Sequence, residues 1–308
     1  MPKSLQFTGV LPILATPFDN DENLDLESFD GMIRFMAELG VDGVTILGVL
    51  GESNRLLDHE REALIKTAVH AAAGNIAVIV GASHSGTLAA LQLSQMAQSL
   101  GADAVMIAPH HEPTPNDQRV FDYFQRIADG LRIPIVAQDH PASTQVHMPV
   151  PLLLRLVNEI PSLACIKEEA VPTAPKIAAL LSGMKQRSVP ILTGLGALYG
   201  GFDLARGSSG FNTGFAFPEV LQAMVAAARA NDSTRVNILY RRYLPLITFE
   251  QQPGVAIRKE LLRMRGLIAT SQVRHPGTRI DASTTAQLQA LVRDTFGDLD
   301  ITQPIQIE

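Results

Sequence analysis

Lys167 is the residue whose type and position most clearly point to chemistry. It ends an apolar run, residues 163–167, that is typical of a buried parallel strand, and two glutamates follow it. Lysine is rarely buried without a partner, and removal from water lowers its pKa toward the range in which a neutral amine attacks a carbonyl. We therefore predict that Lys167 forms a Schiff base. The alternative is a lysine at the edge of the strand that reaches water or pairs with Glu168 or Glu169.

Glu169 is the next candidate, because of its spacing from the lysine. Side chains alternate along a strand, so Lys167 and Glu169 share one face while Glu168 points to the other. If Lys167 faces the mouth of a barrel, Glu169 reaches the same space. A carboxylate there could transfer protons or could only pair with the ammonium group, and the sequence leaves both roles open.

Glycines and histidines follow two further apolar runs. The turn 48–53 contains Gly48 and Gly51, and its N–H groups could hold a small carboxylate, although glycine turns are common in such positions. His110 and His111 resemble the start of a metal site. Adjacent histidines point apart, however, and no third ligand has a suitable spacing, so we predict no metal and expect histidines that contact substrate hydroxyls or solvent.

A third polar group, Asp139, His140 and Ser143, follows another apolar run and resembles a hydrolase triad. Three near neighbours on one segment do not usually align a nucleophile, a base and an orienting group. Ser53 likewise lacks the glycine-flanked elbow of a nucleophilic serine. We therefore do not predict a hydrolase.

The elements that must position these groups follow an alternating pattern. Eight short apolar runs are separated by stretches with apolar residues at the three-and-four spacing of amphipathic helices. The runs are residues 9–15, 43–47, 77–81, 104–107, 134–138, 163–167, 189–193 and 210–213. This alternation predicts an α/β fold, a (β/α)8 TIM barrel, whose site lies at the carboxyl ends of the strands.

The chain after the eighth apolar run is rich in Ala, Leu and Arg, and this composition predicts helices. We divide the chain into a barrel, residues 1–217, that carries the Schiff-base site, and a C-terminal helical extension, residues 218–308. No Gly/Ser-rich linker separates them, so we expect the extension to pack directly on the barrel.

Composition narrows the class of protein. The 308 residues are 46% hydrophobic and 18% charged, which is enough to bury a large core. A net charge of -6 and the absence of any cluster of five or more Lys or Arg argue against a nucleic-acid surface. The single Cys165 excludes an intrachain disulfide and a thiolate metal cluster. With no export or membrane signal found, we expect a cytoplasmic protein that acts on a small molecule.

These features together resemble the dihydrodipicolinate synthase and N-acetylneuraminate lyase family over nearly the whole chain. The resemblance is carried by the turn 48–53, the strand at Lys167, the His140-Pro141 turn and the segment 249–262. It implies a barrel with a helical tail, a homotetramer or dimer, and class I aldolase chemistry without a cofactor, in which Lys167 forms an imine with a 2-oxo acid. The substrate-binding residues that we expect are Leu50, Gly51, Glu52, Ser53, His111, Asp139, Ser143, Gly194 and Asn212.

Three departures from the family pattern bear on the reaction. Val49 and Leu50 replace the hydroxyl residues of the family turn Gly-Thr-Thr-Gly-Glu, so carboxylate binding would rest on backbone N–H groups near Leu50 and Gly51. Gln138 replaces the family tyrosine, and an amide cannot carry a proton as a phenol does. Ser143 replaces the arginine that dihydrodipicolinate synthases use for their second substrate. These changes argue against dihydrodipicolinate synthase activity.

The L-2-keto-3-deoxyarabonate dehydratase branch is similar at the unusual positions. It shares Gln-Asp-x-Pro-Ala-Ser after the fifth strand, a glutamate two residues beyond the imine lysine, and tail segments like residues 252–255 and 274–276, although its strand-two turn differs. This favours loss of water, with Glu169 moving protons and Gln138 positioning. The alternatives are a pyruvate-dependent aldolase, a synthase-like condensation, and a non-catalytic paralogue that binds a keto acid.

Overall fold

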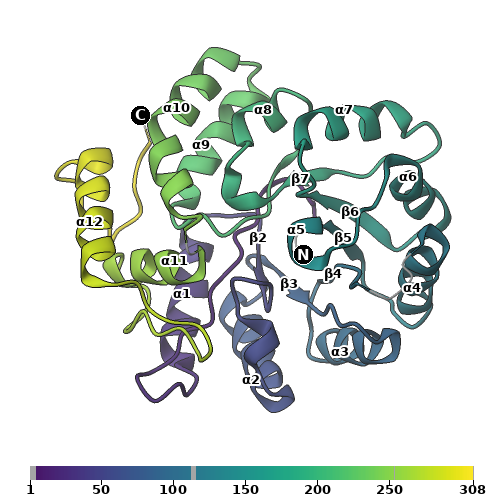
Figure 1. The fold of residues 1–308 in the computed structure, drawn as a ribbon, viewed down its shortest axis with the longest axis horizontal. Coiled ribbons are helices and arrows are strands. Elements are labelled where there is room, and N and C mark those ends of the chain that lie inside the picture. The colour runs from purple at the N-terminus through teal and green to yellow at the C-terminus, as the bar shows by residue number, and fades with distance from the viewer. Residues whose placement is uncertain (1–4, 112–115, 253, 308) are drawn as a thin grey trace.

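A ring of parallel strands surrounded by helices forms the body of the protein (Figure 1). The computed structural model describes residues 5–111, 116–252 and 254–307. Pro253, which belongs to one of the tail segments named above, lies outside the described residues. No helix in the described part of the chain combines the length and apolar character needed to span a bilayer.

Eight parallel strands follow one another in the order β1-β8-β7-β6-β5-β4-β3-β2. They are β1 Gly9–Val10, β2 Gly43–Ile46, β3 Ala77–Gly81, β4 Ala104–Ile107, β5 Ile135–Asp139, β6 Leu163–Glu168, β7 Ile191–Thr193 and β8 Gly210–Phe211. β1 pairs with β8, and a parallel bridge from Ile13 to Thr45 links the chain after β1 to β2. The sheet is therefore nearly closed, and the predicted TIM barrel is confirmed.

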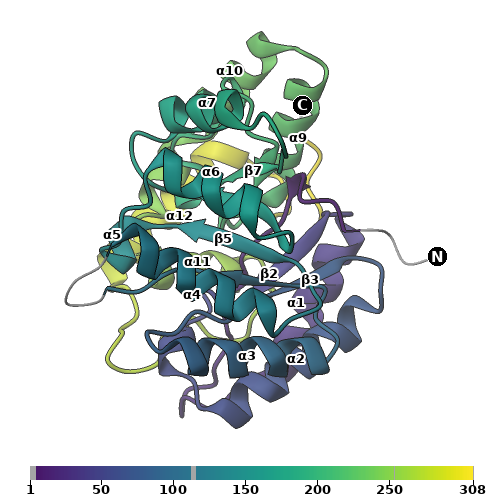
Figure 2. The same cartoon turned by 90° about the vertical axis from the view of Figure 1, so that its right-hand side faces the viewer.

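Helices between the strands form the outer layer, and Figure 2 shows α3, α4, α6 and α7 in front of the strands. The helices are α1 Leu26–Glu38, α2 Asp58–Ala72, α3 Thr87–Ser99, α4 Asp117–Asp129, α6 Val150–Glu159, α7 Thr173–Gly183 and α8 Gly200–Leu204. Three short helices, α5 Pro141–Thr144, η1 Ser53–Arg55 and η2 Leu195–Ala197, stand in loops after strands. In α1, Phe29, Met32, Ile33 and Met36 are the buried residues. Their spacing is the stripe that a barrel helix needs.

The interior of the barrel takes one apolar residue each from β3, β5, β6 and β7 and two from β4. Its apolar cluster contains Phe7, Leu11, Ile79, Ala104, Met106, Val136, Cys165 and Leu192. Because side chains alternate along a strand, an inward Cys165 places Lys167 inside the barrel as well, and an inward Val136 does the same for Gln138. Glu168 and Asp139 must then point outward.

The C-terminal helices lie together on one side of the barrel (Figure 1). They are α9 Pro218–Arg229, α10 Ser233–Phe249, α11 Gly254–Met264 and α12 Ala282–Phe296. They share a second apolar cluster with Val10 and Phe211 of the barrel, so the extension packs directly on it. α9 contacts both β1 and β8. The division at residue 217 remains a proposal, because a boundary after Arg229 would keep the eighth βα unit whole.

Candidate active site

Lys167 lies inside the barrel at the carboxyl end of β6, with 2% of its surface exposed. Its Nζ is 3.0 Å from Oε2 of Glu169, so the two side chains share a face as the alternation predicts. Burial lowers the pKa of Lys167 below its usual value, and the positive charge of Arg258 lowers it further, while Glu169 opposes the shift. The lysine does not reach water, and a lowered pKa increases the fraction of free amine that can attack a carbonyl.

Both carboxylate oxygens of Glu169 are held. Oε2 accepts a 2.7 Å hydrogen bond from Nε2 of Gln138, and Oε1 accepts a 2.9 Å bond from the N–H of Leu195. Burial by itself would raise the pKa of Glu169, but Lys167, His140 and these hydrogen bonds together lower it below its usual value. Glu169 is therefore an ionised carboxylate in a fixed position, which is what a general base requires.

Gly194 leaves room for Glu169. A Cβ atom at position 194 would lie 2.2 Å from Cγ of Glu169, closer than real Cβ atoms approach. Gly194 follows β7 and precedes Leu195, whose N–H binds Glu169. The structure thus gives Gly194 a role in placing Glu169, which the sequence pattern did not suggest.

The side chain of Asp139 points away from Lys167, and this geometry does not support the predicted contact with substrate. Its side chain is fully buried and pairs with Nζ of Lys176, on α7 outside the strands. Glu168 lies beside it, with Oε2 3.7 Å from Nζ of Lys176 and Oε1 accepting a 2.7 Å bond from the N–H of Ala170. Asp139 follows Gln138 directly, so the alternation that turns Gln138 inward turns Asp139 outward.

One ammonium group serves two buried carboxylates in this outward cluster. Burial, and then the charge of Asp139, raise the pKa of Glu168 to about 8. The folded state therefore binds a proton that the unfolded chain, with a carboxyl pKa of 4.5, releases earlier. The stability that this proton contributes is fully present below pH 4.5 and is lost as the pH rises through about 8.

We therefore expect Glu168→Gln to become stabilising, relative to the native chain, as the pH rises. Glutamine has no proton to lose, so the difference in melting temperature between variant and native chain should move in favour of the variant between pH 5 and pH 9. Thermal unfolding across this range measures the difference. A difference that stays constant with pH would show that Glu168 is already ionised at pH 5.

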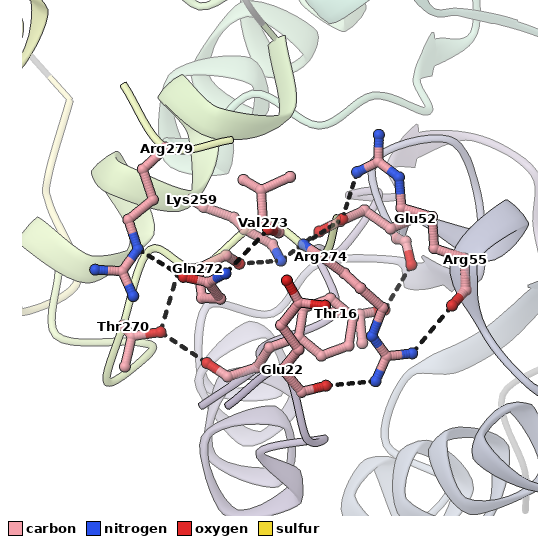
Figure 3. A network of polar contacts seen from close by, with 12 residues as sticks. Thr16, Glu22, Glu52, Arg55, Lys259, Thr270, Gln272, Val273, Arg274 and Arg279 are labelled. Carbon is pink, nitrogen blue, oxygen red and sulfur yellow. Dashed lines mark hydrogen bonds and ion pairs between the residues drawn. The ribbon is translucent and has the colours of Figure 1, made fainter. Parts of the chain in front are cut away.

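The turn after β2 is tied to the C-terminal segment through Glu52. Figure 3 shows Arg55, Lys259 and Arg274 converging on this carboxylate. Arg55 NH1 lies 2.6 Å from Oε2, the N–H of Arg274 donates to the same oxygen over 3.0 Å, and Lys259 pairs with Oε1. Only 1% of Glu52 is exposed. These contacts give Glu52 a role in fixing the turn, and its contact with substrate stays a prediction.

Lys259 is the buried partner in this link. It is fully buried, donates to the carbonyl of Gln272 over 2.6 Å and lies 4.3 Å from the centre of the Phe18 ring. Burial lowers its pKa to about 8. Removing one member of a buried ion pair leaves the other charge poorly compensated, which costs about 3–5 kcal/mol.

We expect Lys259→Met to lower the free energy of unfolding by about 3 kcal/mol, the lower end of that range because Arg55 still pairs with Glu52. Denaturant unfolding measures the loss. Lys66→Met is the matched control, since Lys66 is exposed and its ion pair is with Glu62 in the same helix. A loss no greater in Lys259→Met than in the control would contradict the role given to the pair.

The backbone of the turn remains a candidate anion site. The N–H groups of Leu50 and Gly51 make no hydrogen bond to another described residue. The carbonyl of Gly51 accepts a 2.7 Å bond from Oγ1 of Thr16, which helps to fix the orientation of the peptide. Free N–H groups in a fixed turn suit a carboxylate.

A cavity of about 570 Å³ opens beside this turn. Its lining comprises Leu47, Gly48, Val49, Ser53, Asn54, Arg61, Gly81, Ser83, His84, Ser85, Met106, Ala108, His110, Gln138, Ser143 and Thr144. Ser53 and Ser143 are among the lining residues, and their contact with substrate stays a prediction. His111 is exposed and is not among the lining residues, where its neighbour His110 stands instead.

Asn212 lies deeper in the barrel. Its Nδ2 donates to the carbonyl of Leu11 and to Oγ1 of Thr45, each over 2.8 Å. Its buried Oδ1 has no hydrogen-bond partner among the described residues. Asn212 therefore retains one free acceptor, and its role as a substrate contact stays a prediction.

Three residues near the site were not predicted to act there. His140 influences the pKa of Glu169, and its Nδ1 lies 2.8 Å from Oγ of Ser143. Arg258, on α11, pairs with Glu250 and influences the pKa of Lys167. Arg61, on α2, lines the cavity. His140 and Ser143 lack the carboxylate of a triad because Asp139 is turned away. In the described residues no group of three or more His, Cys, Asp or Glu could hold a metal ion.

Known proteins are similar to this one over nearly the whole chain. Residues 6–295 match the model of the dihydrodipicolinate synthetase family. An L-2-keto-3-deoxyarabonate dehydratase from Azospirillum brasilense is 33% identical over 92% of this chain and 93% of its own length. A 4-hydroxy-tetrahydrodipicolinate synthase from Chlorobium luteolum is 28% identical over 92% of this chain and 95% of its own. The crystal structure of a dihydrodipicolinate synthase from Rhodopseudomonas palustris superposes with a TM-score of 0.89 at 32% identity, covering 95% and 99% of the two chains.

Proposed function

Because this chain belongs to the dihydrodipicolinate synthetase family, we propose that it is a lyase in which Lys167 forms a Schiff base with a 2-keto-3-deoxy sugar acid and water is then eliminated. The observation that carries the proposal is the contact between Lys167 and an ionised Glu169 whose oxygens are held by Gln138 and Leu195. L-2-keto-3-deoxyarabonate, the compound named for the A. brasilense relative, is the first substrate to test.

The first step is attack by the amine of Lys167 on the 2-oxo carbon, with loss of water. The protonated imine is an electron sink that acidifies the proton on C3. Glu169 removes that proton, directly or through a water held by Gln138, and then protonates the departing C4 hydroxyl. The second water lost leaves a C3–C4 double bond conjugated with the imine. Hydrolysis consumes one water and releases the dehydrated 2-oxo product and free Lys167.

The substrate carboxylate is placed against the turn after β2. The free N–H groups of Leu50 and Gly51 are its donors, since Val49 and Leu50 have no hydroxyl to offer. Ser53, Ser143 and Asn212 are the candidates for the hydroxyl groups. No organic cofactor or metal is assigned a step, and we propose a cytoplasmic homotetramer or dimer, as in the family resemblance.

Retro-aldol cleavage is the second candidate, because the same imine supports it. It requires a base at the C4 hydroxyl, whereas dehydration requires one at C3. A synthase-like condensation has less support, since Ser143 and Gln138 stand where the family has an arginine and a tyrosine. A binding protein without activity is the candidate of another class, and the buried amine beside an ionised carboxylate argues against it.

Product analysis separates these candidates. The purified protein is incubated with L-2-keto-3-deoxyarabonate, and products are identified by mass and NMR. Dehydration leaves the five-carbon skeleton intact and lighter by one water, whereas cleavage gives pyruvate and a two-carbon aldehyde. Pyruvate formation would contradict the dehydratase proposal, and an unchanged substrate that still forms an adduct with Lys167 would indicate that this sugar acid is the wrong one.

A further inference from the structure

We propose that the substrate carries a second carboxylate at the end remote from the imine, and that Arg61, with His84 and His110, recognises it. This rests on the proposed function and narrows it, because it requires a 2-keto-3-deoxy diacid in place of a sugar acid that ends in a hydroxymethyl group. The cavity beside the turn after β2 is where this end would lie.

The charge of the cavity lining is the first observation. It contains one arginine and two histidines, and no aspartate or glutamate stands among its described lining residues. This is unusual for a chain with a net charge of -6. Gln138 belongs to the same lining and donates a hydrogen bond to Glu169, which contacts Lys167, so one residue connects the cavity lining with the reacting pair. In the proposal, a substrate attached to Lys167 extends past Gln138 into this space.

Arg61 is a mostly buried cation whose charge is weakly compensated. Its side chain is 14% exposed, and NH2 donates to the carbonyl of Ser53. Its ion pair is with Asp58, at 3.7 Å from Nε, and the side chain of Asp58 is 80% exposed. Exposed pairs of this kind contribute little. Burial lowers the pKa of Arg61, and an anion bound beside the guanidinium would offset the cost of removing this charge from water.

The two histidines add donors to the same space. Nδ1 of His84 accepts a 2.9 Å hydrogen bond from the N–H of Gly86, so in the neutral ring the proton is on Nε2, which is then a donor. Burial, followed by the charge of His84, lowers the pKa of His110, which places the two rings in one electrostatic environment. A guanidinium and imidazole N–H donors that line one cavity match a carboxylate better than they match a single hydroxyl group.

The remaining residues of the cavity lining offer no negative charge to the guanidinium of Arg61. Ser83 is engaged by the N–H of Ala108, which donates to its Oγ over 2.8 Å. Asn54 is neutral, and Val49 and Met106 are apolar. No carboxylate stands among the described lining residues, and the partner proposed for Arg61 is the remote carboxylate of the keto acid.

The test compares two substrates of equal length. One is 2-keto-3-deoxypentonate, which ends in a hydroxymethyl group, and the other is 2-keto-3-deoxypentarate, which ends in a carboxylate. We expect kcat/KM of the native protein to favour the diacid by about 10- to 150-fold, the range for a hydrogen bond to a charged group. Arg61→Gln should bring this ratio close to one, mainly by raising KM for the diacid. Arg34→Gln, at an exposed arginine of α1, should keep the ratio.

Trapping of pyruvate on Lys167 with borohydride shows whether each variant still folds around its site, because pyruvate has no remote end. If Arg61→Gln fails this check, Arg61→Lys and His84→Gln decide instead: a ratio retained by the lysine variant and reduced by the glutamine variant supports the proposal. A native ratio of one or less, or a ratio that survives in Arg61→Gln or in His84→Gln, overturns it. Failure of the native protein to trap pyruvate or either sugar acid would contradict the proposed function itself.

Discussion

Lys167→Arg is expected to abolish turnover while leaving the fold intact. Arginine retains the positive charge beside Glu169, but its guanidinium stays protonated and cannot form the imine. Loss of a covalent nucleophile has lowered kcat by up to about 10⁶-fold in another enzyme, and we expect a loss on the order of 10⁴-fold or more here. Steady-state assays of product formation measure the effect.

The matched control is Lys66→Arg, which makes the same change at an exposed lysine of α2. It should keep its activity, and both variants should unfold at similar denaturant concentrations. Turnover in Lys167→Arg within tenfold of the control would mean that the reaction does not proceed through an imine at this residue.

Glu169→Gln is expected to slow turnover by about 10²- to 10⁴-fold, the usual contribution of a placed acid or base. The amide has nearly the same shape but cannot take the C3 proton. Imine formation should persist, because Glu169 raises the pKa of Lys167 and its removal leaves more free amine. The predicted signature is therefore a low kcat with an adduct on Lys167 that can still be trapped.

Glu168→Gln makes the same chemical change one residue away, on the outward face of β6. It should leave kcat within a few-fold of the native value, since Glu168 contacts Lys176 and not the reacting groups. Equal turnover in Glu169→Gln and the native protein would remove Glu169 from the mechanism and leave it only as a partner of the ammonium group.

The barrel could be predicted from the sequence because its signals are local. Each apolar run and each amphipathic stretch carries its own periodicity, and eight of them in alternation leave few other folds. The shared face of Lys167 and Glu169 follows from the same period of two. The alternation also implied that Gln138 and Asp139 point apart, although we expected a role in the site for both.

The sequence could not show the contacts between distant parts of the chain. Glu52 and Asp139 looked like substrate contacts because polar groups at strand ends face the site in barrels of this kind. Their ion-pair partners, Lys259 and Lys176, come from helices far along the chain. No local sequence pattern predicts ion pairs between such distant residues. A carboxylate next to a glycine turn gives the same sequence pattern whether it binds a ligand or stabilises the turn.

The sequence could not tell which of the two adjacent histidines faces the cavity. A histidine at the cavity was expected after β4, and the structure places His110 there instead of His111. A shift of one residue at the end of a strand reverses the direction of a side chain, and the loop that follows does not preserve the alternation. Arg258 and Arg61 lie on helices. The sequence of a helix does not indicate which of its side chains reach the site at the ends of the strands.

The most direct test of the central claim is reductive trapping followed by peptide mapping. The native protein is incubated with pyruvate or 2-keto-3-deoxypentonate and borohydride, and the intact mass and modified peptide are determined. The chain has six lysines, of which the partly buried Lys176 and the buried Lys259 also form ion pairs, so the map must identify the residue. We predict one adduct, on Lys167, that is absent from Lys167→Arg. No adduct with either compound, or an adduct on another lysine, would contradict the account.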